Sequence, residues 1–201
     1  MVPPLQPFPP VFYQRPVLEV APALMGAFFS RRIGRHLMVG RIVEVEAYRE
    51  DDPASHSYRR RTERNEVMFG LGGHLYVYFT YGMHFCANVV TGPVDRGEAV
   101  LLRAIEPLWG IDEMAERRYG RRRMETRKEL LGLTSGPARL CEAFGLGRKD
   151  NGRSLQGPEV FLAKGVEENA DRVRTSTRIG VTEGKDKKWR WYFEDNPWVS
   201  R

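Results

Sequence analysis

The long alternating run at residues 36–48 constrains the fold of this chain more than any other feature of its sequence. Its side chains fall into two sets: Leu37, Val39, Val43, Val45 and Ala47 on one side, and Met38, Ile42, Glu44, Glu46 and Tyr48 on the other. A period of two is typical of a β-strand, because successive side chains of a strand point to opposite faces. We therefore expect a strand here, with Glu46 and Tyr48 pointing the same way.

Two further alternating runs predict a β-hairpin. Residues 75–81 place Tyr76 and Tyr78 on one face, Tyr81-Gly82 interrupts the pattern, and residues 85–90 resume it. A glycine between two strand-like segments indicates a turn. We therefore expect Tyr81 near the tip of the hairpin.

Other segments complete a mixed pattern of strands and helices. Strands are predicted at residues 98–105, with Leu101, Arg103 and Ile105 on one face and Pro107 as the stop, and at residues 160–163, 177–181 and 189–193. Helical spacing of apolar residues predicts helices over residues 17–32 and 111–128, the second of them rich in arginine and typical of a solvated face. Ser135-Gly136-Pro137 is a helix start, and Gly145 is the corresponding stop.

This mixture predicts the α+β class, with helices separate from the strands. We expect one domain over residues 17–201, since 201 residues suffice to bury a sizeable core. Residues 1–16 are rich in proline, which fixes φ and removes backbone donors, so an extended N-terminal arm is expected there.

Charge and cysteine content narrow the function classes. The chain has 32 Lys and Arg against 26 Asp and Glu, a net charge of +6, which suits a polyanionic partner but also occurs in proteins that never bind nucleic acid. Cys86 and Cys141 lack a paired spacing, so neither a disulfide scaffold nor a zinc ribbon is indicated. The sequence has no signal-peptide order and no apolar run that could cross a bilayer, so we expect a cytoplasmic protein without a membrane partner.

Two groups of residues could carry chemistry. Glu46, beside Tyr48 on an apolar strand, is a reasonable general base in an aromatic pocket, although an exposed glutamate on an edge strand explains the pattern as well. Residues 73–85 are rich in aromatic side chains and could stack nucleobases at about 1–3 kcal/mol per base, although aromatic residues are also ordinary in strands. Tyr81 at a turn favours a wedge between base pairs.

Other motifs are weaker. Gly70-Leu71-Gly72-Gly73 lacks the Lys-Ser/Thr pair of a phosphate-binding loop. The four histidines have no ligand spacing, so no metal site is expected, and no Gly-x-Ser-x-Gly motif marks a serine nucleophile.

A set of ordered blocks resembles the alkyladenine (methylpurine) DNA glycosylase family. The blocks are residues 40–48 (GRIVEVEAY), 52–56 (DPASH), 68–70 (MFG), 74–88 (HLYVYFTYGMHFCAN), 100–107 (VLLRAIEP), 135–137 (SGP), 139–141 (RLC), 178–180 (RIG) and 196–200 (NPWVS). The similarity runs from about Leu18 to Ser200. It implies a single mixed domain on a curved antiparallel sheet, flanked by helices, with a protruding hairpin that inserts into DNA.

The resemblance also implies a role for each matched residue. Tyr81 matches the intercalating wedge, Met83 and His84 brace it, and Arg64 and Arg139 contact DNA. Tyr48 and His56 match residues on one face of the flipped base and Tyr78 the ring on the other, while Asn88 crowds the exocyclic amine of normal guanine. Glu46 and Arg103 match the pair that holds the attacking water, with the backbone carbonyl of Ile179 as a third contact.

The implied activity is that of a monofunctional DNA glycosylase of base excision repair. It would flip 3-methyladenine, hypoxanthine, ethenoadenine or alkylated guanine out of duplex DNA and hydrolyse the N-glycosidic bond with water activated by Glu46. No lysine nucleophile is matched and no cofactor or metal is implied. A compact, monomeric, bacterial-type enzyme of the cytoplasm, associated with the nucleoid, is expected.

The chain departs from the family pattern at Glu63, at Leu71-Gly72 and at Ala138-Arg139, which bears on contacts with DNA and leaves the pocket residues unchanged. Two other functions fit the residues taken alone. One is a non-catalytic protein that binds damaged or single-stranded nucleic acid. The other is a formyl-transfer or RNA-processing domain on a similar sheet.

Overall fold

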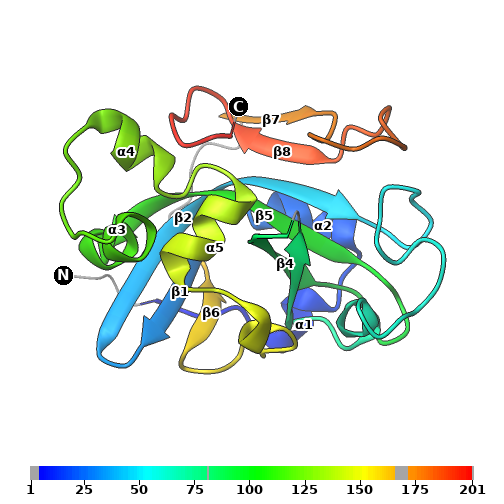
Figure 1. Ribbon diagram of the computed structural model, residues 1–201. Helices are drawn as coiled ribbons and strands as arrows, with labels where there is room; N and C mark the ends of the chain where they lie inside the picture. Colours follow the sequence, from blue (N-terminus) through cyan, green and yellow to red (C-terminus); the bar gives the residue numbers. More distant parts are fainter. Residues whose placement is uncertain (1–4, 81, 166–171, 201) are drawn as a thin grey trace.

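A curled antiparallel sheet is the frame of the protein (Figure 1). In this computed structural model, residues 5–80, 82–165 and 172–200 are described. The sheet runs in the order β3 (Leu75–Thr80), β4 (His84–Val90), β5 (Ala99–Trp109), β2 (His36–Tyr48), β1 (Phe28–Ile33) and β6 (Val160–Ala163). Strands β7 (Val173–Ser176) and β8 (Arg190–Phe193) form a hairpin that joins the sheet through the pairing of β8 with β2. The expected curved antiparallel sheet is confirmed.

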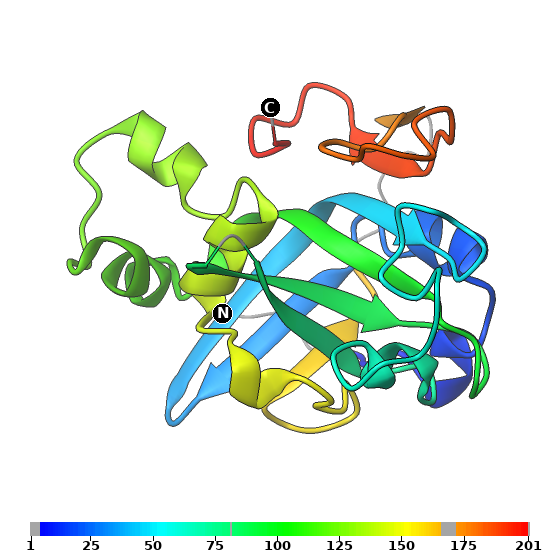
Figure 2. The ribbon, with the colours of Figure 1, turned by 45° about the vertical axis from the view of Figure 1, so that its right-hand side comes forward.

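Strand β2 is the central element because three strands pair with it. Strand β5 covers one of its sides, β1 pairs with its first half, and β8 pairs with residues 44–46. In both ribbon views the β7–β8 hairpin lies over the second half of β2 (Figures 1 and 2). The C-terminal part of the chain is thereby brought to the strand that carries Glu46.

The helices are short and lie around the sheet. They are α1 (Pro10–Tyr13), α2 (Val17–Ala23), α3 (Ile111–Tyr119), α4 (Arg127–Gly132) and α5 (Pro137–Phe144), with 3-10 turns η1 (Glu66–Phe69) and η2 (Arg148–Asp150). Helix α2 packs on β2 and β5, and α5 packs on β4 and β5. Helices α3 and α4 lie on the opposite side of the molecule from the loop of residues 49–65 (Figures 1 and 2).

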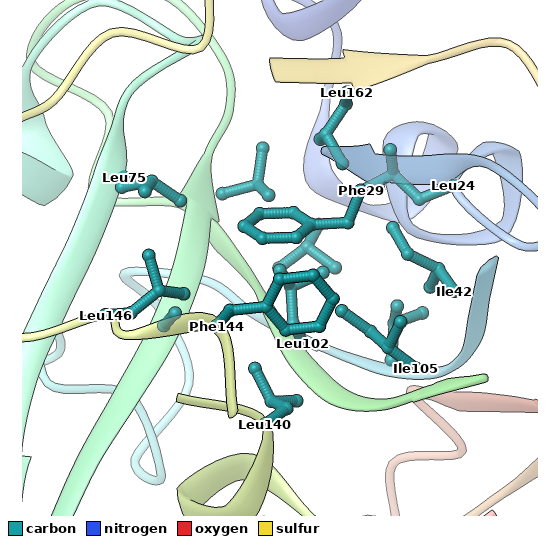
Figure 3. Close-up of a cluster of buried hydrophobic side chains, with 14 of the residues drawn as sticks. Leu24, Phe29, Ile42, Leu75, Leu102, Ile105, Leu140, Phe144, Leu146 and Leu162 are labelled. Carbon is teal, nitrogen blue, oxygen red and sulfur yellow. The ribbon is translucent and has the colours of Figure 1, made fainter. Parts of the chain in front are cut away.

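The main core fills the inside of the curl. Leu24 just after α2, Phe144 of α5 and Leu102 of β5 belong to it, and all three side chains are fully buried (Figure 3). The rings of Phe29 and Phe144 pack edge to face with their centroids 5.0 Å apart, an arrangement that aromatic pairs favour. Each such side chain contributes about 1.5–3 kcal/mol through removal from water, so this core holds α2 and α5 against the sheet.

Two bulges alter the faces that the alternation predicts. Ile42 pairs with Ile105, Glu44 pairs with Ala104, and the register shifts again before Val45. Val43 is thus an extra residue on β2, and Arg103 is an extra residue on β5. Each extra residue shifts the alternation by one, so the residues after it point to the opposite face from the one predicted. Val45 therefore joins Ile42 in the main core, away from Glu44, and Ile105 lies on the core side, away from Arg103. The predicted grouping of Ile42 with Glu46, and of Ile105 with Arg103, was wrong.

The helix predicted over residues 17–32 ends at Ala23. Gly26 follows with φ of 79°, a left-handed conformation that favours glycine and stops a helix. Residues Phe28–Ile33 are instead strand β1, which pairs with β2 and β6. Pairing with two neighbours outweighed the helical spacing of the apolar residues.

Two other predicted segments differ for comparable reasons. The helix expected over residues 111–128 is divided, because Gly120 at φ of 68° ends α3 and Thr126 caps α4 with a capping box. Residues 177–181 are a loop and not a strand: the N–H of Ile179 donates to the Glu46 carboxylate and not to a neighbouring strand. The strand in this part of the chain is β7, which ends at Ser176. Helix α5, between Gly136 and Gly145, and strand β6 are confirmed at the predicted positions.

Residues 5–16 do not form the extended arm that the prolines of the N-terminal segment predict. Pro10 begins the short helix α1, a position that suits proline, and Tyr13 is fully buried. The rings of Phe8 and Phe12 stack at 3.9 Å and pack against the main core. Burial of these aromatic rings explains why the described part of this segment folds onto the protein.

Candidate active site

A cavity of about 350 Å³ opens on the face of the sheet opposite the main core. Asn88 of β4 and Leu101 of β5 line it, whereas their neighbours Val89 and Leu102 belong to the core on the other face. Other parts of the wall come from β3, from the end of β2, from residues 53–56 and 179–182, and from the start of α5. Its volume lies within the range of about 300–1,000 Å³ that is usual for small-molecule sites.

Glu46 lies behind three residues that line this cavity. Its carboxylate is fully buried. Tyr48 donates from Oη to Oε2 at 2.8 Å, Arg103 donates from Nη1 to Oε2 at 3.3 Å, and the backbone N–H of Ile179 donates to Oε1 at 2.8 Å. Because β2 is paired on both sides at this residue, the alternative of an exposed edge glutamate is wrong.

Two side-chain partners of Glu46 keep their protons. Burial, followed by the negative charge of Glu46, raises the pKa of Tyr48 well above its ordinary value, so its hydroxyl keeps the proton that it donates. Although burial opposes it, the carboxylates of Glu46 and Glu44 raise the pKa of Arg103. The guanidinium therefore stays charged beside Glu46.

An aromatic group forms another part of the wall. The His56 and Tyr78 rings contact each other at 4.5 Å between centroids and 75° between planes, and His56 Nδ1 lies 3.0 Å from the Tyr76 hydroxyl. Burial of the ring and the charge of Arg64 lower the pKa of His56 to about 4, although part of the residue is exposed at the cavity mouth, so His56 is neutral near pH 7. Since His56 and Tyr78 already touch, a base cannot lie between these two rings in this geometry.

A buried ion pair supports Tyr48 from behind. The guanidinium of Arg178 lies 4.7 Å from the centre of the Tyr48 ring and donates to both carboxylate oxygens of Asp52. Both side chains of the pair are fully buried. Arg178 also donates to the carbonyls of Ala47 and Gly184, at 3.1 and 3.2 Å. The pair thus joins the loop after β2 to the loop that carries Ile179.

The pair also sets the charge of its carboxylate. Although burial opposes it, the hydrogen bonds and charge of Arg178 hold the pKa of Asp52 below its ordinary value. Asp52 is therefore ionised over the whole physiological range.

Among the described residues predicted to contact DNA, Met83, His84, Arg64 and Arg139 lie outside the cavity wall. Met83 is 70% exposed at the β3–β4 turn, and His84 lies 3.4 Å from Glu142 of α5. Arg64 is exposed, with its guanidinium 5.7 Å from the centre of the Tyr78 ring, and Arg139 is exposed near the start of α5. Strands β3 and β4, predicted as the two arms of the hairpin, pair antiparallel. Tyr81, the predicted wedge, lies outside the described residues.

The structure thus brings together most of the predicted pocket. Tyr48, His56, Tyr78, Asn88, Arg103 and Ile179 line one cavity, and Glu46 is bound by three of them. The resemblance gives the backbone carbonyl of Ile179 as a contact of the attacking water; in the structure the N–H of the same residue donates to Glu46. Asp52 and Arg178 had no predicted role, although each opens a block of the family resemblance. Only their pairing across the loops reveals what they do.

Neither a metal-binding cluster nor a membrane-spanning helix is found among the described residues. Within residues 5–80, 82–165 and 172–200, no group of three or more His, Cys, Asp and Glu side chains could hold a metal ion. In the same part of the chain, no helix is long and apolar enough to span a membrane.

Known proteins show extensive similarity to this chain. The family model described as methylpurine-DNA glycosylase matches residues 11–197. A protein of Carboxydothermus hydrogenoformans, named as a 3-methyladenine DNA glycosylase, is 46% identical over 194 residues, which cover 96% of this chain and 98% of the relative. Similarly named proteins of Francisella tularensis and Burkholderia orbicola are 41% and 44% identical, over 92% and 96% of this chain and 93% and 90% of their own lengths.

Proposed function

This chain belongs to the methylpurine-DNA glycosylase family, and from that membership we propose that it excises damaged purines from duplex DNA with water activated by Glu46. The family makes it an N-glycosyl hydrolase of DNA repair. The observation that carries it is the set of three donors that hold the buried Glu46 carboxylate at the cavity.

The hydrogen bonds of Glu46 support a role in binding water. A carboxylate accepts about four hydrogen bonds, and the described residues supply three, two to Oε2 and one to Oε1. The remaining acceptor position is on Oε1, where an attacking water can donate. As the base departs, positive charge develops on the sugar, and Glu46 stabilises that charge while it accepts a proton from the water.

The aromatic residues support recognition of a flipped purine. In our proposal the base lies between Tyr48 and Tyr78, and His56, packed against Tyr78, faces it from the side. Neutral His56 adds no positive charge next to an alkylated base that already carries one. Asn88, whose amide donates to the carbonyl of Tyr76 at 3.1 Å, is held where it can exclude the exocyclic amine of normal guanine.

The substrates proposed are 3-methyladenine, hypoxanthine, ethenoadenine and alkylated guanine. Tyr81 is the proposed wedge that fills the space of the flipped nucleotide, with Met83 and His84 beside it, and Arg64 and Arg139 contact the phosphates. The reaction needs only water and side chains of this chain, without strand cleavage. We propose a monomer that works in the bacterial cytoplasm at the nucleoid.

The replacement Glu46→Gln tests the catalytic role. It keeps the shape of the side chain but removes the base, so release of hypoxanthine from a duplex with one lesion should slow by about 10²–10⁴-fold. Binding of the same duplex should stay within a few-fold of wild type. Glu66→Gln, at an exposed ion pair with Arg61, is the matched control and should release base normally. Normal release by Glu46→Gln would overturn the assignment.

A further inference from the structure

A second buried glutamate, two residues before Glu46, accepts four hydrogen bonds through its carboxylate. Glu44 Oε1 accepts from Arg103 Nε at 3.0 Å, from Arg190 Nε at 2.7 Å and from Ser200 Oγ at 2.9 Å. Its Oε2 accepts from the backbone N–H of Ser200 at 2.7 Å. Both oxygens of this carboxylate are thus bound by donors from three different residues, so Glu44 holds Arg103, Arg190 and Ser200 in place.

Arg103 connects this glutamate to Glu46. Its three guanidinium nitrogens each reach a different side chain: Nε donates to Glu44, Nη1 to Glu46 at 3.3 Å, and Nη2 to Ser200 Oγ at 3.2 Å. A guanidinium is planar and rigid, so two fixed nitrogens determine where the third one points. The bonds to Glu44 and Ser200 therefore aim Nη1 at Glu46.

The segment that carries Ser200 is itself held against the two bulged strands. Trp198 and Val199 pack with Val43 and Ala104, at the bulges of β2 and β5. Asn196 donates to Glu106 at 3.2 Å and accepts from the N–H of Trp198 at 3.0 Å. Residues 196–200 thus form a strap that fixes the position of the Ser200 hydroxyl.

Stability alone does not explain this cluster. Glu44, Glu46, Arg103 and Arg190 are all buried, with two charges of each sign. Replacing buried ion pairs by apolar side chains of similar volume is often neutral or stabilising, so their contribution to folding is small compared with that of apolar packing. What the cluster provides, and apolar side chains cannot, is a defined orientation for Arg103.

We propose that Glu44 and Ser200 are positioning residues, through which the C-terminal strap sets the orientation of Arg103 and hence of the Glu46 carboxylate. This inference rests on the proposed role of Glu46. It adds that residues at the C-terminal end, which need not touch DNA, control the rate of base release.

The test compares Ser200→Ala with Ser200→Thr. Loss of the hydroxyl removes its bonds to Glu44 and Arg103, and should slow single-turnover base release at saturating enzyme about tenfold, since a hydrogen bond to a charged group is lost. Threonine keeps the hydroxyl and should restore the rate. Ser200→Gly, a second variant without the hydroxyl, should be slowed like alanine.

Ser176→Ala is the matched control. Ser176 Oγ accepts from Arg190 Nη1 at 2.9 Å, so it touches the same cluster but makes no bond to Arg103. This variant should release base at the normal rate. The slowing in Ser200→Ala should be equal for hypoxanthine and for 3-methyladenine, because it acts through Glu46, while the DNA dissociation constant stays close to wild type.

Three outcomes decide between the explanations. A normal rate in both Ser200→Ala and Ser200→Gly, or equal slowing in Ser176→Ala, would overturn the positioning role. Slowing that is accompanied by an equal loss in Ser200→Thr would also overturn it and indicate a purely structural contact. Glu46→Gln is measured alongside. If Glu46→Gln keeps normal base release, the proposed function fails. If Glu46→Gln loses base release while Ser200→Ala keeps it, only the positioning role of the strap is rejected.

Discussion

The arginines behind the cavity and those of the α3–α4 projection (residues 111–132) are the same residue type in contrasting surroundings. Arg103 and Arg178 are buried, and each donates several hydrogen bonds to carboxylates or carbonyls from distant parts of the chain. On the projection, Arg121 and Arg122 are partly or mostly exposed and pair with glutamates of the same segment. Helix α4 buries none of its residues and stands apart from the sheet (Figure 2).

This difference separates geometry from net charge. A buried guanidinium with fixed partners sets the direction of a neighbouring side chain, whereas an exposed one adds to the positive field of the protein and is screened by salt. The geometry of the cavity therefore depends on individual arginines, whereas the positive charge of the projection depends only on how many arginines it carries. Substitutions behind the cavity should therefore change the stability of the protein more than substitutions on the projection.

The largest effect is expected from breaking the buried pair behind Tyr48. Asp52→Ala leaves the fully buried Arg178 without its carboxylate, and loss of one partner of a buried pair costs about 3–5 kcal/mol. Urea unfolding should show this loss in the free energy of unfolding. The neighbouring Asp51→Ala, at an exposed pair with Arg49, is the control and should unfold like wild type. If Asp52→Ala and Asp51→Ala had the same free energy of unfolding, the buried pair would contribute no more to stability than the exposed one.

An intermediate effect is expected from pH, through His56. Its pKa is about 4 in the folded protein and about 6.5 when unfolded, so between these values the unfolded chain binds more protons. Stability should therefore fall as pH is lowered from 6.5 to 4, and should fall further at lower pH as Asp52, whose pKa is also lowered, takes up a proton. Melting temperatures measured from pH 7 to pH 3.5 test this.

The variant His56→Gln sharpens the pH prediction. Its neutral side chain cannot take up a proton, so its melting temperature should depend less on pH between 6.5 and 4. A slope equal to that of wild type would show that His56 is not the group responsible.

The smallest effect is expected on the projection. Arg122→Ala removes contacts from a mostly exposed guanidinium to Glu113 and Glu116, and ion pairs of such an exposed group contribute little. The melting temperature should change by less than about 2 °C, and it should do so at both low and high salt. A drop as large as that in Asp52→Ala would show that the projection is held as tightly as the cavity.

The sequence by itself determined the elements whose cause is local. The alternation at residues 36–48 is strand β2, the tyrosine-rich run is the β3–β4 hairpin, and Gly136 and Gly145 bound helix α5. In each case the side-chain period or the turn residue acts over a few neighbouring positions. The same alternation also placed Glu46 and Tyr48 together, and the two side chains are hydrogen-bonded.

Only the tertiary structure decided which distant residues meet. Strand β1 forms because two partner strands are present, and the bulges that turn Ile105 away from Arg103 depend on how β2 and β5 pair. The bonds from Arg178 to Asp52 and from Ser200 to Glu44 join residues more than a hundred positions apart. No local period encodes such contacts, because they arise only when burial of the shared core brings the two segments together.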